Sequence, residues 1–304
     1  MMLGIDLGGT KIEVIALDER GGELLRERCN TPQGNYGATV AAVATLVRNA
    51  EERVGAGDMK SSAGVTLATV GIGIPGTESK ATGLIKNANS TCLIGRPLRR
   101  DIEVALGRPV RLANDANCFA LSEATDGAGA GAEVVFGVIL GTGVGGGIVV
   151  RGHVLAGING IAGEWGHNPM PGEHHRPSCY CGRKGCIELY LSGPGMAKEH
   201  KRTTLSELAP PAIVARAAAG DTECEATLKL YEARLARALA TVINIVDPDV
   251  IVLGGGLSNL DRLYANVPAL WDEHVFSDRV DTRLVKAKFG DSSGARGAAW
   301  LWND

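Results

Sequence analysis

The sequence predicts an α/β fold, and three observations support that class. Short apolar runs rich in β-branched residues alternate along the 304 residues with longer stretches of helical periodicity. Several of the apolar runs lead into glycine-rich turns, as strands that end at a loop often do. The layout of residues 3–25 returns at residues 136–157: an apolar run, a Gly/Thr turn, a second apolar run and a polar turn.

Seven apolar runs predict strands, and two amphipathic stretches predict long helices. The predicted strands are residues 2–7, 12–17, 65–74, 110–113, 134–140, 147–150 and 250–253. In residues 38–54, apolar side chains from Val40 to Val47 fall on one face of a helix. Residues 226–246 do the same from Leu228 to Val246. Both helices are expected to face a core.

The internal repeat suggests two similar halves, each opening with a glycine-rich hairpin. Gly4 aligns with Gly137, and the Leu-Gly pair at residues 7–8 aligns with the pair at residues 140–141. Chance likeness between two glycine-rich hairpins explains this pattern equally well from the sequence alone.

Composition and charge exclude several classes of protein. The net charge is -3 and no long basic run is present, so a nucleic-acid partner is not expected. No stretch is apolar enough to span a membrane, and "MMLGIDLGGTK" lacks the cationic start and apolar core of a signal peptide. Seven cysteines without an export signal favour reduced thiols or metal ligands over disulfides. The sequence therefore predicts a cytoplasmic protein.

Three glycine clusters follow predicted strands and indicate a nucleotide site. No P-loop motif is present, and neither G-x-G-x-x-G match opens a helix, which excludes a dinucleotide fold. Glycine turns let backbone N–H groups approach phosphates, and Thr10, Lys11 and Thr142 add donors. The third cluster, residues 254–256, leads into an expected helix whose N-terminus would face the nucleotide. Each cluster alone is more often a structural turn, but three together favour nucleotide binding.

Asn114 and Asp115 lie between a predicted strand and a predicted helix. Both residue types are good N-caps, which is the structural interpretation. The functional alternative is a catalytic base at the carboxyl end of a strand. Phosphoryl transfer to an alcohol needs a carboxylate to accept the hydroxyl proton while Mg²⁺ and backbone donors hold the phosphates. These residues alone leave both interpretations open.

Residues 163–188, "GEWGHNPMPGEHHRPSCYCGRKGCIE", concentrate metal-binding side chains. The thiols are those of Cys179, Cys181 and Cys186, and one histidine would complete a tetrahedral zinc site. Three histidines are candidates: His167, His174 and His175. Three exposed thiols would be prone to oxidation, so a closed structural Zn²⁺ site is predicted. The metal would rigidify a loop that carries Glu164 and Glu188.

Seven motifs together resemble the ROK family of sugar kinases. They are "DLGGTK", "LANDANC", "GTGVGGG", "GEWGH", "CYCGRKGCIE", "DPDVIVLGGG" and "GDSSGARGAAWLW", in order through the chain. The resemblance implies an actin-like ATPase fold of the hexokinase, ribonuclease H-like type, with two α/β domains around a cleft. It implies domain limits at 1–117 plus 291–304 for the first domain and 118–290 for the second. It also implies transfer of the ATP γ-phosphoryl group to a hexose hydroxyl, with Mg²⁺.

The resemblance implies a role for each matching residue. Asp115 is implied as the catalytic base. The implied sugar contacts are Gly76, Asn89, Asn114, Asp115, Glu164, His167 and Glu188. The implied nucleotide contacts are Asp6, Gly8, Gly9, Thr10, Lys11, Gly141, Thr142, Gly143, Gly145 and Gly255. The implied zinc ligands are His167, Cys179, Cys181 and Cys186.

The resemblance also implies a substrate. "KNANST" at residues 86–91 with "GEWGHNP" most resembles bacterial fructokinases that also accept mannose. We therefore expect ATP-dependent phosphorylation of fructose at its 6-hydroxyl. N-acetylglucosamine kinases share "NDANCFALSEA" and are the alternative within the family, together with glucose kinases.

An alternative of another class is a sugar-sensing transcription regulator of the same family. Such relatives carry a DNA-binding domain before the first phosphate loop, whereas here that loop begins at Asp6. The intact glycine turns and Asp115 favour the enzyme. The expected partners are a hexose, ATP and a second copy of the chain in a homodimer.

Overall fold

The computed structural model describes residues 1–57, 67–290 and 293–303, and contacts divide the chain into two compact units. Unit 1 comprises Met1–Gly131, Gly147–Ala162 and Asp291–Asp304, and unit 2 comprises Ala132–Gly146 and Gly163–Gly290. This division keeps helix α3 (Asp115–Thr125) whole in unit 1, whereas the expected limit at residue 117 falls inside that helix.

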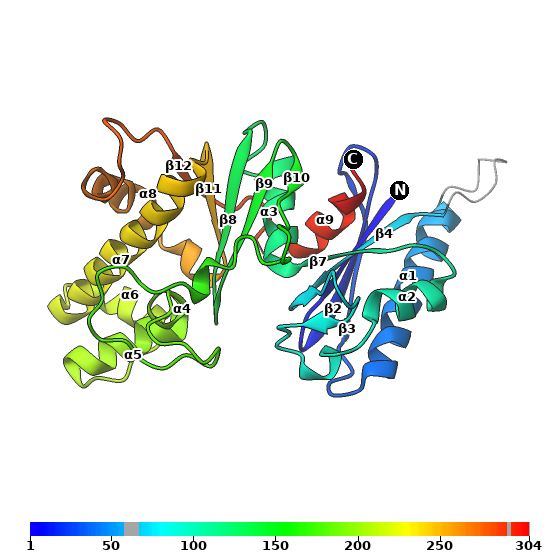
Figure 1. The fold of residues 1–304 in the computed structure, drawn as a ribbon, viewed down its shortest axis with the longest axis horizontal. Helices are drawn as coiled ribbons and strands as arrows, with labels where there is room; N and C mark the ends of the chain where they lie inside the picture. The colour runs from blue at the N-terminus through cyan, green and yellow to red at the C-terminus, as the bar shows by residue number, and fades with distance from the viewer. Residues whose placement is uncertain (58–66, 291–292, 304) are drawn as a thin grey trace. The chain divides into compact units, whose positions relative to one another are not determined.

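The first sheet has five strands in the order β3-β2-β1-β4-β7 (Figure 1). Their bounds are β1 Met2–Leu7, β2 Lys11–Leu17, β3 Glu23–Asn30, β4 Thr69–Ile74 and β7 Arg111–Asn114. Strands β1, β2 and β3 form an antiparallel meander, and β4 and β7 continue the sheet parallel to β1. The carboxyl ends of β1, β4 and β7 therefore lie at one edge of the sheet.

The second sheet repeats this order with the next five main strands, β10-β9-β8-β11-β12. Their bounds are β8 Val134–Leu140, β9 Val144–Val150, β10 His153–Val154, β11 Val250–Gly254 and β12 Arg283–Lys286. Strand β11 runs parallel to both β8 and β12. Because each sheet begins with the repeated hairpin and has the same strand order, the internal repeat is a structural repeat and not a chance likeness.

Helices cover both faces of the first sheet. Leu3 and Ile5 of β1 belong to the core cluster with Val43 and Val47 of α1 (Tyr36–Gly57), and α2 (Leu98–Leu106) packs beside α1. Gly4 faces the other side by strand alternation, where a Cβ would lie 1.9 Å from the Ala295 carbonyl oxygen. Helix α9 (Ser293–Ala299) therefore packs backbone against backbone on β1. Glycine at this position is required for that approach.

The second predicted long helix is α7 (Thr222–Val246), which packs against three shorter helices of unit 2. These are α4 (Glu188–Leu191), α5 (Gly193–Thr204) and α6 (Pro210–Ala218). Asp221 caps α7, because its Oδ1 accepts the N–H groups of Glu223 and Cys224 at 3.0 Å each. Among the described residues, no helix combines the length and the apolar composition that a membrane crossing requires.

The remaining elements are short. They are β5 (Thr77–Glu78), β6 (Ile85–Lys86), α8 (Leu263–Asn266) and the 3-10 helices Thr91–Leu93, Trp165–His167, Gly256–Asn259, Pro268–Glu273 and Trp300–Trp302. The helix expected after the third glycine cluster is thus a 3-10 helix of 4 residues. Of the predicted strand 65–74, residues 65–66 lie outside the described residues, and β4 begins at Thr69.

Candidate functional site

Three loops of unit 1 leave the same edge of the first sheet and bring predicted site residues together. The register pairs Asp6 of β1 with Gly73 of β4, and Ile74 of β4 with Asn114 of β7. The first glycine turn, Gly76 and Asp115 therefore all lie just beyond carboxyl strand ends. This is the edge at which α/β sheets commonly bind ligands.

The first glycine turn is tight and exposed. The Gly8 N–H donates to the Lys11 carbonyl oxygen at 3.0 Å, and a Cβ on Gly8 would lie 2.8 Å from that same oxygen. The Thr31 hydroxyl donates to the Gly8 carbonyl oxygen at 2.7 Å, which fixes the turn from the end of β3. Gly9, Thr10 and Lys11 are exposed. This geometry suits backbone contacts to phosphates, and the nucleotide role of the turn stays a prediction.

Asn114 has the structural role that its position suggested. It is the N-cap of α3, since its Oδ1 accepts the Ala116 N–H at 2.9 Å, and its Nδ2 donates to the Gly76 carbonyl oxygen at 3.2 Å. Gly76 has φ +152°, and a Cβ there would lie 2.9 Å from Ala88, so glycine is required. The Asn89 N–H donates to the Pro75 carbonyl oxygen at 3.2 Å, which places Asn89 beside this cluster.

Asp115 is half-buried and is the first residue of α3, and its Oδ1 accepts the Ala116 N–H at 2.8 Å. Burial first, and then the nearby charges of Asp115 and Glu13, raise the pKa of Asp6 from its ordinary 3.8 to about 6. Two carboxyl groups that repel one another near the carboxyl ends of β1 and β7, which β4 separates in the sheet, form an environment that favours a divalent cation.

The burial of Asp6, together with this electrostatic repulsion, predicts that Asp6→Asn stabilises the protein at neutral pH. The folded-state pKa of Asp6 lies above its unfolded value, so the wild type loses stability as pH rises from 3.8 to about 6. At about 1.4 kcal/mol for each pKa unit, the amide should gain about 3 kcal/mol in free energy of unfolding above pH 6. Urea denaturation of the nucleotide-free protein measures this. An equal gain at pH 4 would contradict it, because the folded protein carries this carboxyl group protonated there.

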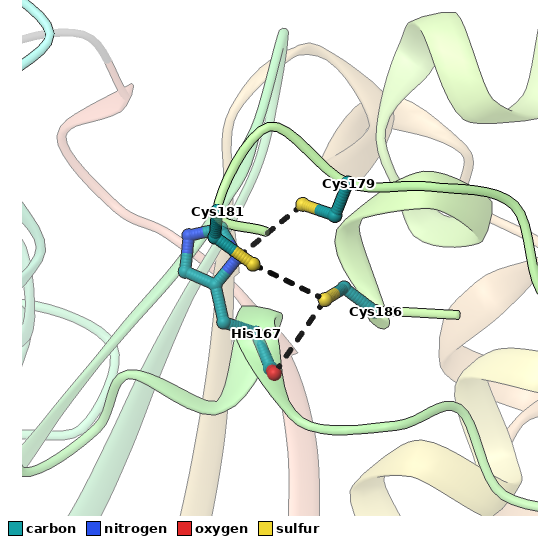
Figure 2. A group of neighbouring side chains, drawn as sticks. All are labelled: His167, Cys179, Cys181 and Cys186. Carbon is teal, nitrogen blue, oxygen red and sulfur yellow. Dashed lines mark hydrogen bonds between the residues drawn. The ribbon is translucent and has the colours of Figure 1, made fainter. Parts of the chain in front are cut away.

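In unit 2, four predicted metal ligands converge (Figure 2). The ligand atoms of His167, Cys179, Cys181 and Cys186 all lie within 4.8 Å of one another. The Cys181 and Cys186 Sγ atoms are 3.6 Å apart, and the Cys179 Sγ is 3.8 Å from the His167 Nδ1. Tetrahedral zinc with Zn–S bonds of about 2.3 Å places two sulfurs about 3.8 Å apart. The Cys₃His donor set therefore fits zinc in both chemistry and spacing.

Backbone contacts hold the ligand loop together. The Ile187 N–H donates to the Asn168 carbonyl oxygen at 2.9 Å, and the Met170 N–H donates to the Gly185 carbonyl oxygen at 2.8 Å. Gly182 and Gly185 have φ of +85° and +70°, which lets the chain fold back between the cysteines. Of the three candidate histidines, His167 lies in the cluster. His174 and His175 are exposed and are not among its ligands.

Tyr180 is a site residue that the sequence analysis missed. Its hydroxyl lies 3.1 Å from the His167 Nε2, and the two rings meet edge to face with centroids 5.3 Å apart. An Nε2–H donated to this phenol leaves the Nδ1 lone pair facing the cysteine sulfurs. Burial, followed by the charges of Glu188, Cys179 and Glu164, raises the pKa of Tyr180 to about 12. Of the predicted sugar contacts of unit 2, His167 is the one that Tyr180 touches in these interactions.

The second glycine turn lies at the carboxyl end of β8. The Gly141 N–H donates to the Gly143 carbonyl oxygen at 3.0 Å, and Thr142 is exposed. Gly255 follows the neighbouring strand β11 with φ +79°, and a Cβ there would lie 2.5 Å from the Leu140 carbonyl oxygen. Gly145 lies within β9, where its carbonyl oxygen accepts the Trp165 Nε1–H at 3.3 Å. Gly145 thus contributes to packing in addition to its predicted nucleotide role.

Comparison with known proteins assigns the family. The model of the ROK family matches residues 2–304. The chain is 40% identical over 309 residues to the N-acetyl-D-glucosamine kinase of Photobacterium profundum, and the match covers 99% of this chain and 99% of the relative.

Two solved structures are similar over nearly their full length. A ROK hexokinase from Thermus thermophilus matches with 30% identity and a TM-score of 0.85, covering 99% of this chain and 97% of the other. A ROK family glucokinase from Streptomyces griseus, in complex with glucose and AMPPNP, matches with 28% identity and a TM-score of 0.77. It covers 99% of this chain and 98% of the other.

These matches confirm the actin-like ATPase fold, with its mixed α/β sheets. They do not support the fructokinase expectation that "KNANST" suggested, because the Photobacterium profundum relative is an N-acetyl-D-glucosamine kinase. The chain belongs to the ROK family, and the coarser expectation, an ATP-dependent sugar kinase of that family, is confirmed.

Proposed function

We propose that this sugar kinase transfers the γ-phosphoryl group of ATP to the 6-hydroxyl of N-acetyl-D-glucosamine. The observation that carries the proposal is 40% identity over essentially the whole of both chains with an enzyme of that name. The fructose expectation rested on two short motifs, residues 86–91 and 163–169, whereas the relative matches along the entire chain. N-acetyl-D-glucosamine, the alternative of the sequence analysis, is therefore the better-supported acceptor.

Asp115 acts as the general base in this proposal. As the sugar oxygen forms its bond to the γ-phosphorus, the bond to the ADP oxygen breaks and the hydroxyl proton passes to the Asp115 carboxylate. Asn114 and Gly76 fix the loop around Asp115, because the Asn114 Nδ2 bonds the Gly76 carbonyl oxygen at 3.2 Å. Sugar hydroxyls are proposed to bond the residues that the family resemblance implies: Asn89, Asn114, Glu164, His167 and Glu188.

The two glycine turns are proposed to hold the ATP phosphates through their exposed backbone N–H groups. Gly255 is proposed to contact the adenosine side of the nucleotide. Mg²⁺, when bound, would neutralise charge on the phosphates, and Asp6 is proposed to help orient it. The Cys₃His cluster is proposed to bind one structural Zn²⁺. A homodimer stays a prediction.

A coupled assay of ADP release with four sugars tests the acceptor. We expect the highest kcat/KM with N-acetyl-D-glucosamine and lower values with glucose, mannose and fructose. A best value with fructose would overturn the acceptor, and no turnover with any of the four under Mg-ATP would overturn the kinase assignment. The phosphorus NMR signal of the product checks the position. Phosphate on the 6-oxygen couples to two protons and gives a triplet, whereas a ring position gives a doublet.

A further inference from the structure

We propose that Glu188 is a positioning residue for the second glycine turn, so that its carboxylate helps to tie the metal-binding loop to the nucleotide loop. The inference rests on the proposed function, in which the turn at Gly141–Gly143 binds ATP phosphates. A sugar contact alone would not require this role for Glu188. The inference predicts that Glu188 affects nucleotide binding even when no sugar is present.

The carboxylate of Glu188 lies directly against the turn. Its Oε2 accepts the N–H of Val144, the first residue of β9, at 3.0 Å. A Cβ on Gly143 would lie 2.6 Å from the same oxygen, so glycine at 143 leaves room for the carboxylate. Glu188 is half-buried, so the charge-assisted bond is partly shielded from water. The carboxylate therefore fixes the exit of the turn into β9.

A second contact from the same segment fixes the entry of the turn. The Gly193 N–H, at the start of α5, donates to the Gly141 carbonyl oxygen at 2.9 Å. The Ser192 N–H donates to the Glu188 carbonyl oxygen at 3.1 Å, which connects the two contacts through α4. Residues 188–193 thus form hydrogen bonds with the turn at both its entry and its exit.

The metal-binding loop sets the position of this segment. Cys186 precedes Glu188 by two residues, and its carbonyl oxygen accepts the Leu189 N–H at 2.9 Å. The Cys186 Sγ lies 3.6 Å from both the Cys181 Sγ and the His167 carbonyl oxygen. A metal at this cluster therefore fixes the start of α4, and with it the direction in which Glu188 projects.

Two Glu188 variants and a matched control test the proposal by binding of a fluorescent ATP analogue with Mg²⁺ and without sugar. We expect Glu188→Ala to weaken binding about tenfold, because the Val144 N–H loses its charged acceptor. Glu188→Gln keeps an acceptor oxygen and should recover most of that loss. Glu164→Ala is the control, since Glu164 has the same implied sugar role but is exposed and precedes the 3-10 helix at Trp165–His167. It should bind the analogue like the wild type.

Removal of zinc with a chelator extends the test to the loop. Binding by the wild type should weaken about as much as in Glu188→Ala, and the chelator should have little further effect on that variant. Equal binding by the wild type and Glu188→Ala, or equal losses in Glu188→Ala and Glu164→Ala, would overturn the inference. If the losses of binding from the chelator and from Glu188→Ala were fully additive, the link between the metal and Glu188 would be overturned. A wild type that binds no nucleotide would instead overturn the proposed function.

Discussion

Asp115→Asn is expected to lower kcat by about 10²- to 10⁴-fold, the contribution usual for a general base. Asparagine has nearly the shape of aspartate, and its oxygen still accepts the Ala116 N–H, so α3 should begin as before. It cannot take up the hydroxyl proton as the sugar oxygen attacks. Steady-state kinetics should therefore show lost turnover, while calorimetry should show that sugar binding is largely retained.

Asp221→Asn is the matched control for this prediction. Asp221 caps α7, so the control makes the same chemical change at another helix start, and asparagine caps as well as aspartate. Its kcat should stay within about twofold of the wild type. Near-wild-type turnover by Asp115→Asn would show that the base lies elsewhere.

Cys181→Ser is expected to remove the bound metal and most of the activity. Three sulfurs and the His167 imidazole converge in the wild type, and a hydroxyl is a much poorer zinc ligand than a thiolate. Elemental analysis should find one zinc per chain in the wild type and well under one in the variant, with kcat/KM lower by at least about tenfold.

Cys92→Ser controls for the loss of a thiol as such, because Cys92 is half-buried outside the cluster. It should keep one zinc and near-wild-type activity. Metal-free wild type with full activity would contradict the zinc assignment.

The sequence was most informative where the interacting residues lie close in the chain. The proposed zinc ligands fall between residues 167 and 186, so spacing and thiol chemistry were enough to predict their cluster. The hairpins were predicted for the same reason, since each joins adjacent strands across a short turn. The choice of His167 over His174 and His175 needed the family resemblance, because all three satisfy the spacing.

Contacts between residues that are distant in the chain could not be predicted from the sequence. Strand β3 was missed because "ELLRERCN" is charged. Its Arg26 and Arg28 form ion pairs with the buried Glu13 of β2, a partner that lies on another strand. The hydrogen bond from the Val144 N–H to the Glu188 carboxylate joins residues 44 positions apart, and no local sequence pattern predicts it. Tyr180 was passed over because an aromatic residue between two cysteines has no spacing rule.

Acceptor specificity was the least predictable property. Fructose, mannose, glucose and N-acetyl-D-glucosamine all carry a primary hydroxyl that the proposed base, Asp115, could deprotonate, so the same catalytic motifs would serve each of them. Discrimination depends on differences in transition-state contacts around the rest of the sugar, which short motifs do not encode. A whole-length relative carries that information better than "KNANST" does.

A competition experiment tests the central claim most directly. The protein is given equimolar N-acetyl-D-glucosamine, glucose, mannose and fructose with limiting Mg-ATP, and mass spectrometry measures the phosphorylated products. The ratio of products reports the ratio of kcat/KM values. We predict that N-acetylhexosamine phosphate predominates. Predominance of hexose phosphate, or release of inorganic phosphate without any sugar phosphate, would contradict the account.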